Sequence, residues 1–155
     1  MANYAIGNDM GGTQQALTST YKTLLSVFAG STARRAKMYD LLIGTNGTPA
    51  DNYMEFDVSR MTADGTGTAI TPNALDPADA AALATSKANY TAEPTVTASS
   101  STFYVGINQR ASYRWIAAPG SELVFPATAN NGFVVRTRSG GYTGTATAKA
   151  LVQEQ

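Results

Sequence analysis

The sequence predicts an all-β protein, an antiparallel β-sandwich with a jelly-roll-like topology. Several segments alternate apolar and polar residues with the period of two that a half-buried strand requires. From residue 103 onward, strand and turn alternate at a spacing of roughly ten residues, which is typical of an antiparallel sandwich or barrel. About eight strands with one long connection favour a jelly roll, and an open barrel is the alternative that the same pattern leaves open.

The clearest strands are expected at 53–60, 102–109 and 132–138, where alternation is regular. In the first of these, Met54, Phe56 and Val58 share one face of the strand. The last strand alternates Ala with Thr, and its small Ala face permits close packing. The less regular strands are expected at 20–28, 36–43, 112–117, 121–125 and 142–152, with turns at Asn46-Gly47, Pro119-Gly120, Asn130-Asn131-Gly132 and Gly140-Gly141 between strands.

One short helix is expected near 76–85, inside a long excursion that covers residues 63–94. Asp76 offers an N-cap acceptor, Pro77 suits the first helical position, and Asp79 places an acid three residues after the cap. The alanines that follow have high helix propensity. Because so short a helix is marginal alone, neighbouring elements would have to hold it. The excursion is the expected lid or flap of the sandwich.

The chain has 155 residues, a length that fits one domain with a substantial core. Residues 1–12 show neither the strand nor the helix period, so we expect an extended N-terminal arm there and a single β-sandwich domain over 13–155. Tyr4, Ile6 and Met10 are spaced apolar residues that would let the arm dock on a partner. Terminal disorder is the alternative for this segment.

Composition argues against whole classes of function. The chain has 11 basic and 11 acidic residues, a net charge of zero, and neither histidine nor cysteine. The lack of histidine excludes His-based catalytic triads and His-ligated metal sites, and the lack of cysteine excludes disulfides and thiolate sites. Scattered basic residues disfavour nucleic-acid binding, and no apolar run has the length of a membrane span. We therefore expect no enzyme activity, no cofactor, no metal, no nucleic acid and no membrane. The absence of disulfides favours assembly inside a reducing cell. The N-terminus also lacks the pattern of a signal peptide.

The few candidate sites are weak on chemical grounds. Glu55 and Asp57 lie on one face of one strand, whereas glycosidases need two carboxyl groups across a cleft. Gly65-Thr66-Gly67 lacks the lysine of a phosphate-binding loop. We expect no catalytic residues.

A basic cluster and two tyrosines are candidates for a protein interface. Arg34, Arg35 and Lys37 form the only tight basic cluster. They would bind an acidic partner surface through directional ion pairs, or else protect a strand edge from unwanted pairing. Tyr53 and Tyr104 are expected to point outward from their strands, and amphipathic tyrosines are frequent at interfaces.

Two long stretches resemble a known family. Residues 39–83 and 107–155 resemble small virion proteins of tailed bacteriophages, most strongly in GTNGTPADN (44–52) and PNALDP (72–77). These look like the jelly-roll cement, or decoration, proteins that sit as trimers on icosahedral heads. The resemblance implies a structural virion protein that binds the outer head surface, stabilises contacts between major capsid protein subunits, and is assembled in the host cytoplasm. A receptor- or carbohydrate-binding module of a fibre or tail is the alternative.

Overall fold

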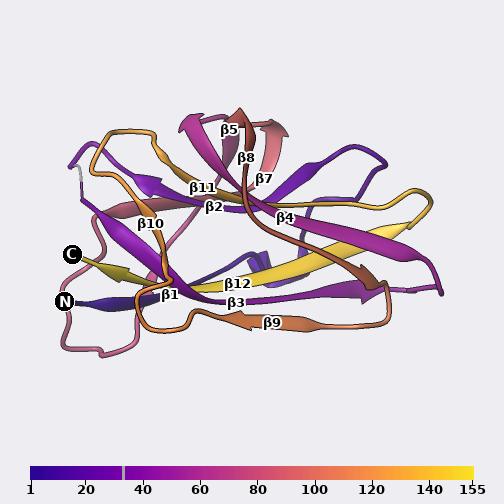
Figure 1. Cartoon of the computed structure of the whole chain (residues 1–155), viewed down its shortest axis with the longest axis horizontal. Helices are drawn as coiled ribbons and strands as arrows, with labels where there is room; N and C mark the ends of the chain where they lie inside the picture. Colours follow the sequence, from indigo (N-terminus) through magenta and orange to yellow (C-terminus); the bar gives the residue numbers. More distant parts are fainter. Residues whose placement is uncertain (33) are drawn as a thin grey trace.

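The computed structural model describes residues 1–32 and 34–155. In this part of the chain, twelve strands form two antiparallel sheets that pack face to face (Figure 1). There is also one short 3-10 turn. The strands are β1 (Asn3–Gly7), β2 (Lys22–Ala29), β3 (Ala36–Gly47), β4 (Tyr53–Ala63), β5 (Thr66–Ile70), β6 (Asn73–Ala74), β7 (Ala84–Ala92), β8 (Thr95–Asn108), β9 (Tyr113–Ile116), β10 (Leu123–Phe125), β11 (Gly132–Arg138) and β12 (Gly144–Glu154), and the turn is η1 (Met10–Gly12). The predicted all-β sandwich is confirmed.

The order of the strands is that of a jelly roll. Sheet A, the lower layer of Figure 1, has the order β10-β3-β12-β1-β6, with β9 also paired to β3. Sheet B, the upper layer, has the order β5-β7-β2-β11-β4-β8. Strands β9 and β10 together act as one interrupted strand along β3. Setting β5, β6 and β7 aside, the four-strand orders β1-β12-β3-β9/β10 and β2-β11-β4-β8 are those of a double Greek key.

All eight strands expected from the sequence are present as β2, β3, β4, β8, β9, β10, β11 and β12. The segment of β2 is less regular because two consecutive leucines interrupt its alternation. Its register with β11 shifts between Val135 and Arg136, and this bulge turns the consecutive Leu24 and Leu25 into the core, where they are 1% and 0% exposed.

The excursion after β4 extends the sandwich and forms no separate lid. Strands β5 and β7 continue sheet B beyond β2, and β6 continues sheet A beyond β1. Strand β7 escaped prediction because its inward positions carry the small residues Ala84, Ser86 and Ala88, which give almost no hydrophobic alternation. The excursion therefore adds strands to both sheets at the same edge of the sandwich.

The helix expected near 76–85 does not form. The Asp76 carboxylate does accept the Ala78 N–H at 2.9 Å, as a capping residue would. The chain then leaves the helical path, because the Glu154 carboxylate takes the N–H groups of Leu83 and Ala84 at 2.8 and 2.6 Å. Tertiary contacts with the C-terminal strand thus outweigh the helix propensity of a short alanine run.

The expected N-terminal arm is also wrong for most of its length. Residues 3–7 form β1, which pairs with β12 on one side and β6 on the other. Tyr4 and Ile6 are 2% and 0% exposed, and the Tyr4 hydroxyl donates to the Ala80 carbonyl at 2.9 Å. The Asn8 amide extends the attachment, donating to the Ala146 carbonyl at 3.0 Å. A five-residue strand with only two large apolar residues is too short for periodicity to identify.

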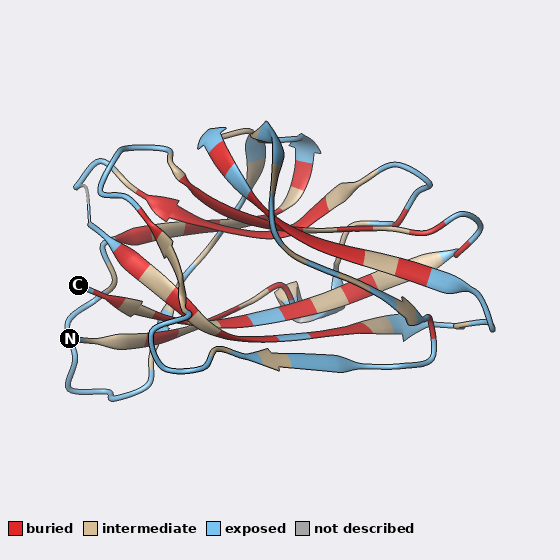
Figure 2. Cartoon of the chain, in the orientation of Figure 1, coloured by how far each residue is buried: buried red, intermediate tan, exposed pale blue. Residues whose placement is uncertain are grey.

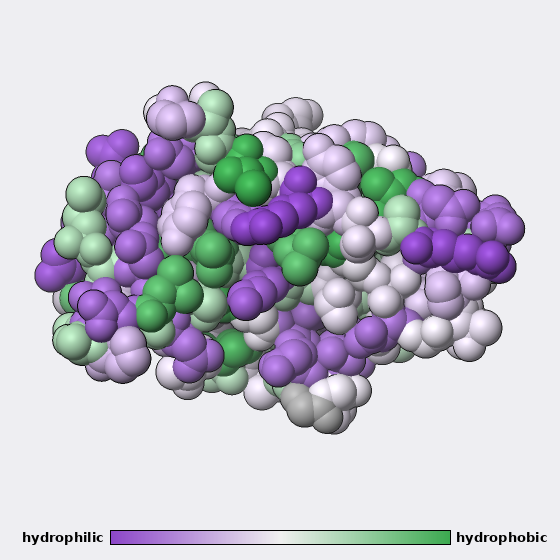
Figure 3. All heavy atoms as spheres, turned by 90° about the horizontal axis from the view of Figure 1, so that it is seen from below, coloured by the Kyte–Doolittle hydropathy of each residue, from purple (hydrophilic) through white to green (hydrophobic). Residues whose placement is uncertain are grey.

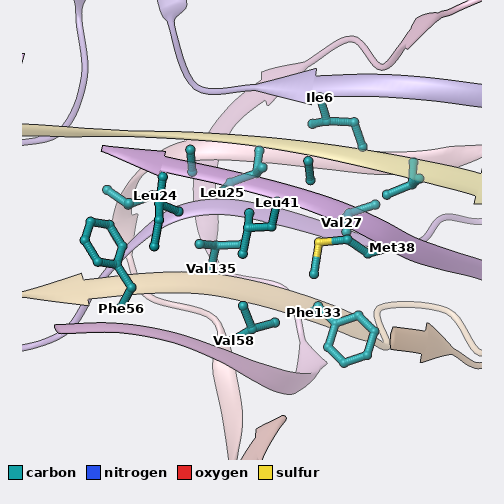
Figure 4. Packing of buried hydrophobic residues seen from close by; sticks show 14 of the residues in the cluster. Ile6, Leu24, Leu25, Val27, Met38, Leu41, Phe56, Val58, Phe133 and Val135 are labelled. Atoms are coloured by element: carbon teal, nitrogen blue, oxygen red, sulfur yellow. The ribbon is translucent and has the colours of Figure 1, made fainter. Parts of the chain in front are cut away.

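The core lies between the two sheets, where the buried residues of Figure 2 concentrate. Figure 4 shows Leu41 and Met38 of β3 facing Leu25, Val58 and Val135 of sheet B. Strand β12 contributes Ala146, Ala148 and Ala150, all buried. These small side chains leave room for the larger residues of the facing sheet, which agrees with the close packing expected of the Ala face.

The burial of Ile6 can be tested by truncation. Ile6→Ala is expected to lower the free energy of unfolding by about 2–5 kcal/mol, because it leaves a cavity in the core. Leu75→Ala, at a residue that is 52% exposed, is the control and should change it by less than about 0.5 kcal/mol. Urea denaturation measures both. If Ile6→Ala were as harmless as the control, residues 3–7 would be a free arm after all.

Candidate functional site

The carboxylates considered for catalysis are held in ion pairs. Glu55 and Asp57 do lie on one face of β4, as expected, and each binds an arginine of the neighbouring β11. Arg136 Nε donates to Asp57 Oδ2 at 2.9 Å, and Arg138 binds Glu55. The hydrogen bond from Arg138 holds the pKa of Glu55 below its ordinary value, although burial opposes the shift. These acids form a cross-strand ladder of charges and not a pair across a cleft.

Two exposed aliphatic residues lie on the outer face of sheet A. Strand alternation turns Leu41 and Ile43 of β3 inward and leaves Leu42 between them on the outside. Leu42 is 44% exposed, and Ile116 of β9 is 61% exposed. Figure 3, which views the molecule from the side of sheet A, shows hydrophobic side chains separated by hydrophilic ones over the middle of this face.

The register of the strands makes this arrangement a grid. Leu42 lies between Arg114 of β9 and Lys149 of β12. In the neighbouring row, Asp40 lies between Ile116 and Leu151. Apolar and charged side chains therefore alternate along and across the sheet. We call Asp40, Leu42, Arg114, Ile116, Lys149 and Leu151 the sheet A patch.

The charges of the sheet A patch are ordered. Arg114 Nε donates to both carboxylate oxygens of Asp40, at 3.0 and 3.2 Å. The Asp40 side chain is 9% exposed, whereas that of Arg114 is 57% exposed. This hydrogen bonding raises the pKa of Arg114 above its ordinary value. A fixed guanidinium with free edges can bind a carboxylate or carbonyl group of a partner at little entropic cost.

Two shallow depressions meet on the sheet A patch. One, of about 240 Å³, lies among Asp40, Leu42, Arg114, Lys149 and Leu151. The other, of about 360 Å³, runs from Leu42 and Lys149 towards Ile70 beside β1. Leu42 and Lys149 line both depressions, so the two lie side by side and could receive protruding side chains of another protein.

The residues nominated from the sequence are spread over the molecule. Tyr4 and Ile6 are in the core, and Met10 is half-buried in η1. Tyr53 and Tyr104 are 55% and 57% exposed, on the outer face of sheet B, which agrees with their predicted outward orientation. They therefore lie on the side of the sandwich opposite the sheet A patch.

The basic cluster is divided by the fold. Arg34 and Arg35 are exposed before β3 begins, whereas Lys37 is half-buried on β3 and pairs with Glu122 at 3.2 Å. Lys37 therefore does not extend a free basic surface. The sheet A patch was not predicted from the sequence, although the sequence holds one signal of it. Residues 41–43 are all apolar, so in a strand Leu42 must face away from Leu41 and Ile43.

Comparison with protein-family models, with curated proteins and with solved structures found no significant match. In the described residues, no helix is long and apolar enough to cross a membrane. The same residues hold no cluster of three or more acidic side chains that could bind a metal ion.

The Glu55–Arg138 pair predicts a pH dependence of stability. Because the pKa of Glu55 is lowered in the folded protein, its charged form stabilises the fold above the ordinary value of 4.5, and this contribution is lost as the pH falls through the lowered pKa. Glu55→Gln should therefore be less stable than wild type at pH 7, with a difference that shrinks as the pH drops below 4.5.

Urea denaturation between pH 7 and pH 3 measures this difference. Asp51→Asn removes an exposed carboxylate that pairs with Arg110, and it serves as the control. It should stay within about 0.5 kcal/mol of wild type at pH 7. A constant gap between Glu55→Gln and wild type over the whole range would contradict the prediction.

Proposed function

We propose that this chain is a non-enzymatic structural virion protein, a cement protein that binds the outer surface of an icosahedral phage head as a trimer. In this proposal it stabilises contacts between major capsid protein subunits through the sheet A patch. The observation that carries the proposal is the exposure of Leu42 and Ile116 on a continuous sheet face, beside the ion-paired Arg114 and the exposed Lys149. The jelly-roll fold and the family resemblance of 39–83 and 107–155 support it.

The sheet A patch has the composition of a protein-binding surface. Covering an exposed leucine or isoleucine gains roughly 25 cal/mol for each Å² of apolar surface that leaves water. Arg114 and Lys149 add directional and charged contacts that select an acidic or carbonyl-rich partner. A partner whose acidic and apolar side chains alternate in the same way would match the grid, which gives register as well as affinity.

A trimer would multiply this modest contact. Three copies that share one site on the head bind with a combined affinity that exceeds the affinity of any one of them, since the second and third contacts form at a high effective concentration. Such a protein needs neither a cofactor nor a catalytic residue. Its work is to hold neighbouring capsid subunits together when the head is heated or filled.

The trimer gives a direct prediction. Native mass spectrometry of the purified chain, or of chain released gently from particles, should find a species with three times the 16.2 kDa mass of the monomer. A monomer both in solution and on particles would contradict the trimer while leaving the contact with the capsid open to the next experiment.

Capsid stabilisation is tested with particles that contain or lack the chain. Particles with the chain should resist heating to a higher temperature, measured by DNA release, and should carry it in hundreds of copies. Equal heat resistance would contradict the cementing role. A few copies at the tail tip would instead favour the fibre or tail module.

The sheet A patch is tested with two charge insertions. Leu42→Asp and Ile116→Asp should weaken binding to heads lacking the chain at least about tenfold, because each places a carboxylate where apolar surface would be buried. Tyr53→Asp, at a similarly exposed residue on sheet B, is the matched control and should bind like wild type. Equal loss in all three variants would show that the patch is not the contact.

A further inference from the structure

A second surface hollow lies on the outer face of sheet B. It has a volume of about 440 Å³ and lies between the bend of β8 and the strands β4 and β11. Two tyrosines, an ion pair and a row of hydroxyl groups line it, and the residues used below are Tyr21, Asp57, Ser59, Ser99, Tyr104 and Arg136. We call it the sheet B groove.

The groove exists because β8 departs from its partner. The register of β4 with β8 shifts after Val58 and again around Met61. Ser99 has a φ of 56°, a left-handed conformation that is uncommon outside glycine. The bulge carries 97–101 away from the regular ladder, and a non-glycine residue kept in this conformation is more frequent at binding sites than elsewhere.

The floor of the groove is a preorganised polar network. Asp57 Oδ2 accepts hydrogen bonds from Arg136 Nε at 2.9 Å and from Ser59 Oγ at 2.6 Å. Arg136 Nη2 also donates to Ser59 Oγ at 3.1 Å. The Asp57 side chain is only 4% exposed. In the described part of the chain, no hydrogen bond reaches its second oxygen, Oδ1, and this atom is not fully buried. The oxygen is therefore an acceptor that a ligand in the groove can use.

Two tyrosines form the walls. Arg136 and Arg138 hold the Tyr21 ring in place, with guanidinium carbons 4.7 and 5.2 Å from its centre. The Tyr104 ring is exposed, and within the described residues it stacks on no other aromatic ring. An exposed, unstacked ring beside free hydrogen-bonding groups offers an apolar face to a ligand.

We propose that the sheet B groove binds a neutral saccharide. Sugar hydroxyl groups would bond to the free Asp57 oxygen and to the exposed Ser99 hydroxyl. The C–H face of a pyranose ring would stack on Tyr104, whose π face is electron-rich. An anionic ligand fits poorly. Asp57 already compensates the charge of Arg136, and Glu55 compensates that of Arg138. The volume lies within the range of small-molecule sites.

The groove and the sheet A patch lie on opposite layers of the sandwich (Figure 1). A copy attached through sheet A would therefore present the sheet B groove to the surrounding solution. Saccharide binding does not depend on the proposed attachment, since the isolated chain carries the complete groove.

The test uses the purified full chain on an array of neutral, sialylated and sulfated oligosaccharides, followed by calorimetric titration of the strongest hit. We expect binding to neutral oligosaccharides. Tyr104→Ala should weaken it about tenfold, since it removes the stacking face. Tyr53→Ala, a similarly exposed tyrosine of the same sheet outside the groove, should bind like wild type.

Three results would overturn the inference. They are binding to no neutral oligosaccharide, binding to acidic oligosaccharides alone, and equal weakening by Tyr53→Ala and Tyr104→Ala. Because both tyrosines are exposed, neither substitution should unfold the chain, and denaturation curves of the two variants confirm that the comparison is fair. Head binding is measured separately, so failure here leaves the cement role untouched.

Discussion

The pairing of β12 with both β3 and β1 is the constraint on which the rest of this structure depends. The last strand runs along nearly the whole of β3 and takes the first strand on its other side. Both ends of the chain are thereby locked into the middle of sheet A. The inward alanines of β12 set how closely the sheets approach, while its outward Lys149 and Leu151 build part of the sheet A patch. One strand thus couples the packing of the core to the chemistry of the surface.

The two outer faces differ because the strands that form them pair differently. On sheet A, the pairing of β3 with β9 and β12 exposes single apolar residues such as Leu42 between charged neighbours. This gives a broad, shallow surface suited to another protein. On sheet B, register shifts in β8 open a groove, and the cross-strand pairs of Asp57 and Glu55 with arginines furnish it with fixed polar groups. Both proposals place the function on these surfaces, and neither requires a reaction centre.

Much of the fold could be predicted from local pattern. Segments 53–60 and 132–138 alternate regularly, and they correspond to β4 and β11. They could be predicted because the period of a strand depends only on consecutive residues. The helix and the N-terminal arm were predicted wrongly because contacts with distant residues decide both segments. The Glu154 carboxylate accepts hydrogen bonds from the N–H groups of Leu83 and Ala84, and no helix forms near 76–85. Residues 3–7 pair with β12, so they form no free arm.

The sequence by itself determined that this is an all-β chain with an apolar core, eight recognisable strands and no histidine or cysteine with which to build a reaction centre. Only the tertiary structure decided which surfaces stay exposed. Leu42 and Leu41 are equally apolar and adjacent in the chain, yet one is at the surface and the other in the core. Likewise, Tyr104 borders a groove and Tyr53 does not. The burial of a side chain and the residues around it depend on pairing between strands that are far apart in the sequence. The local pattern of residues does not determine which strands pair.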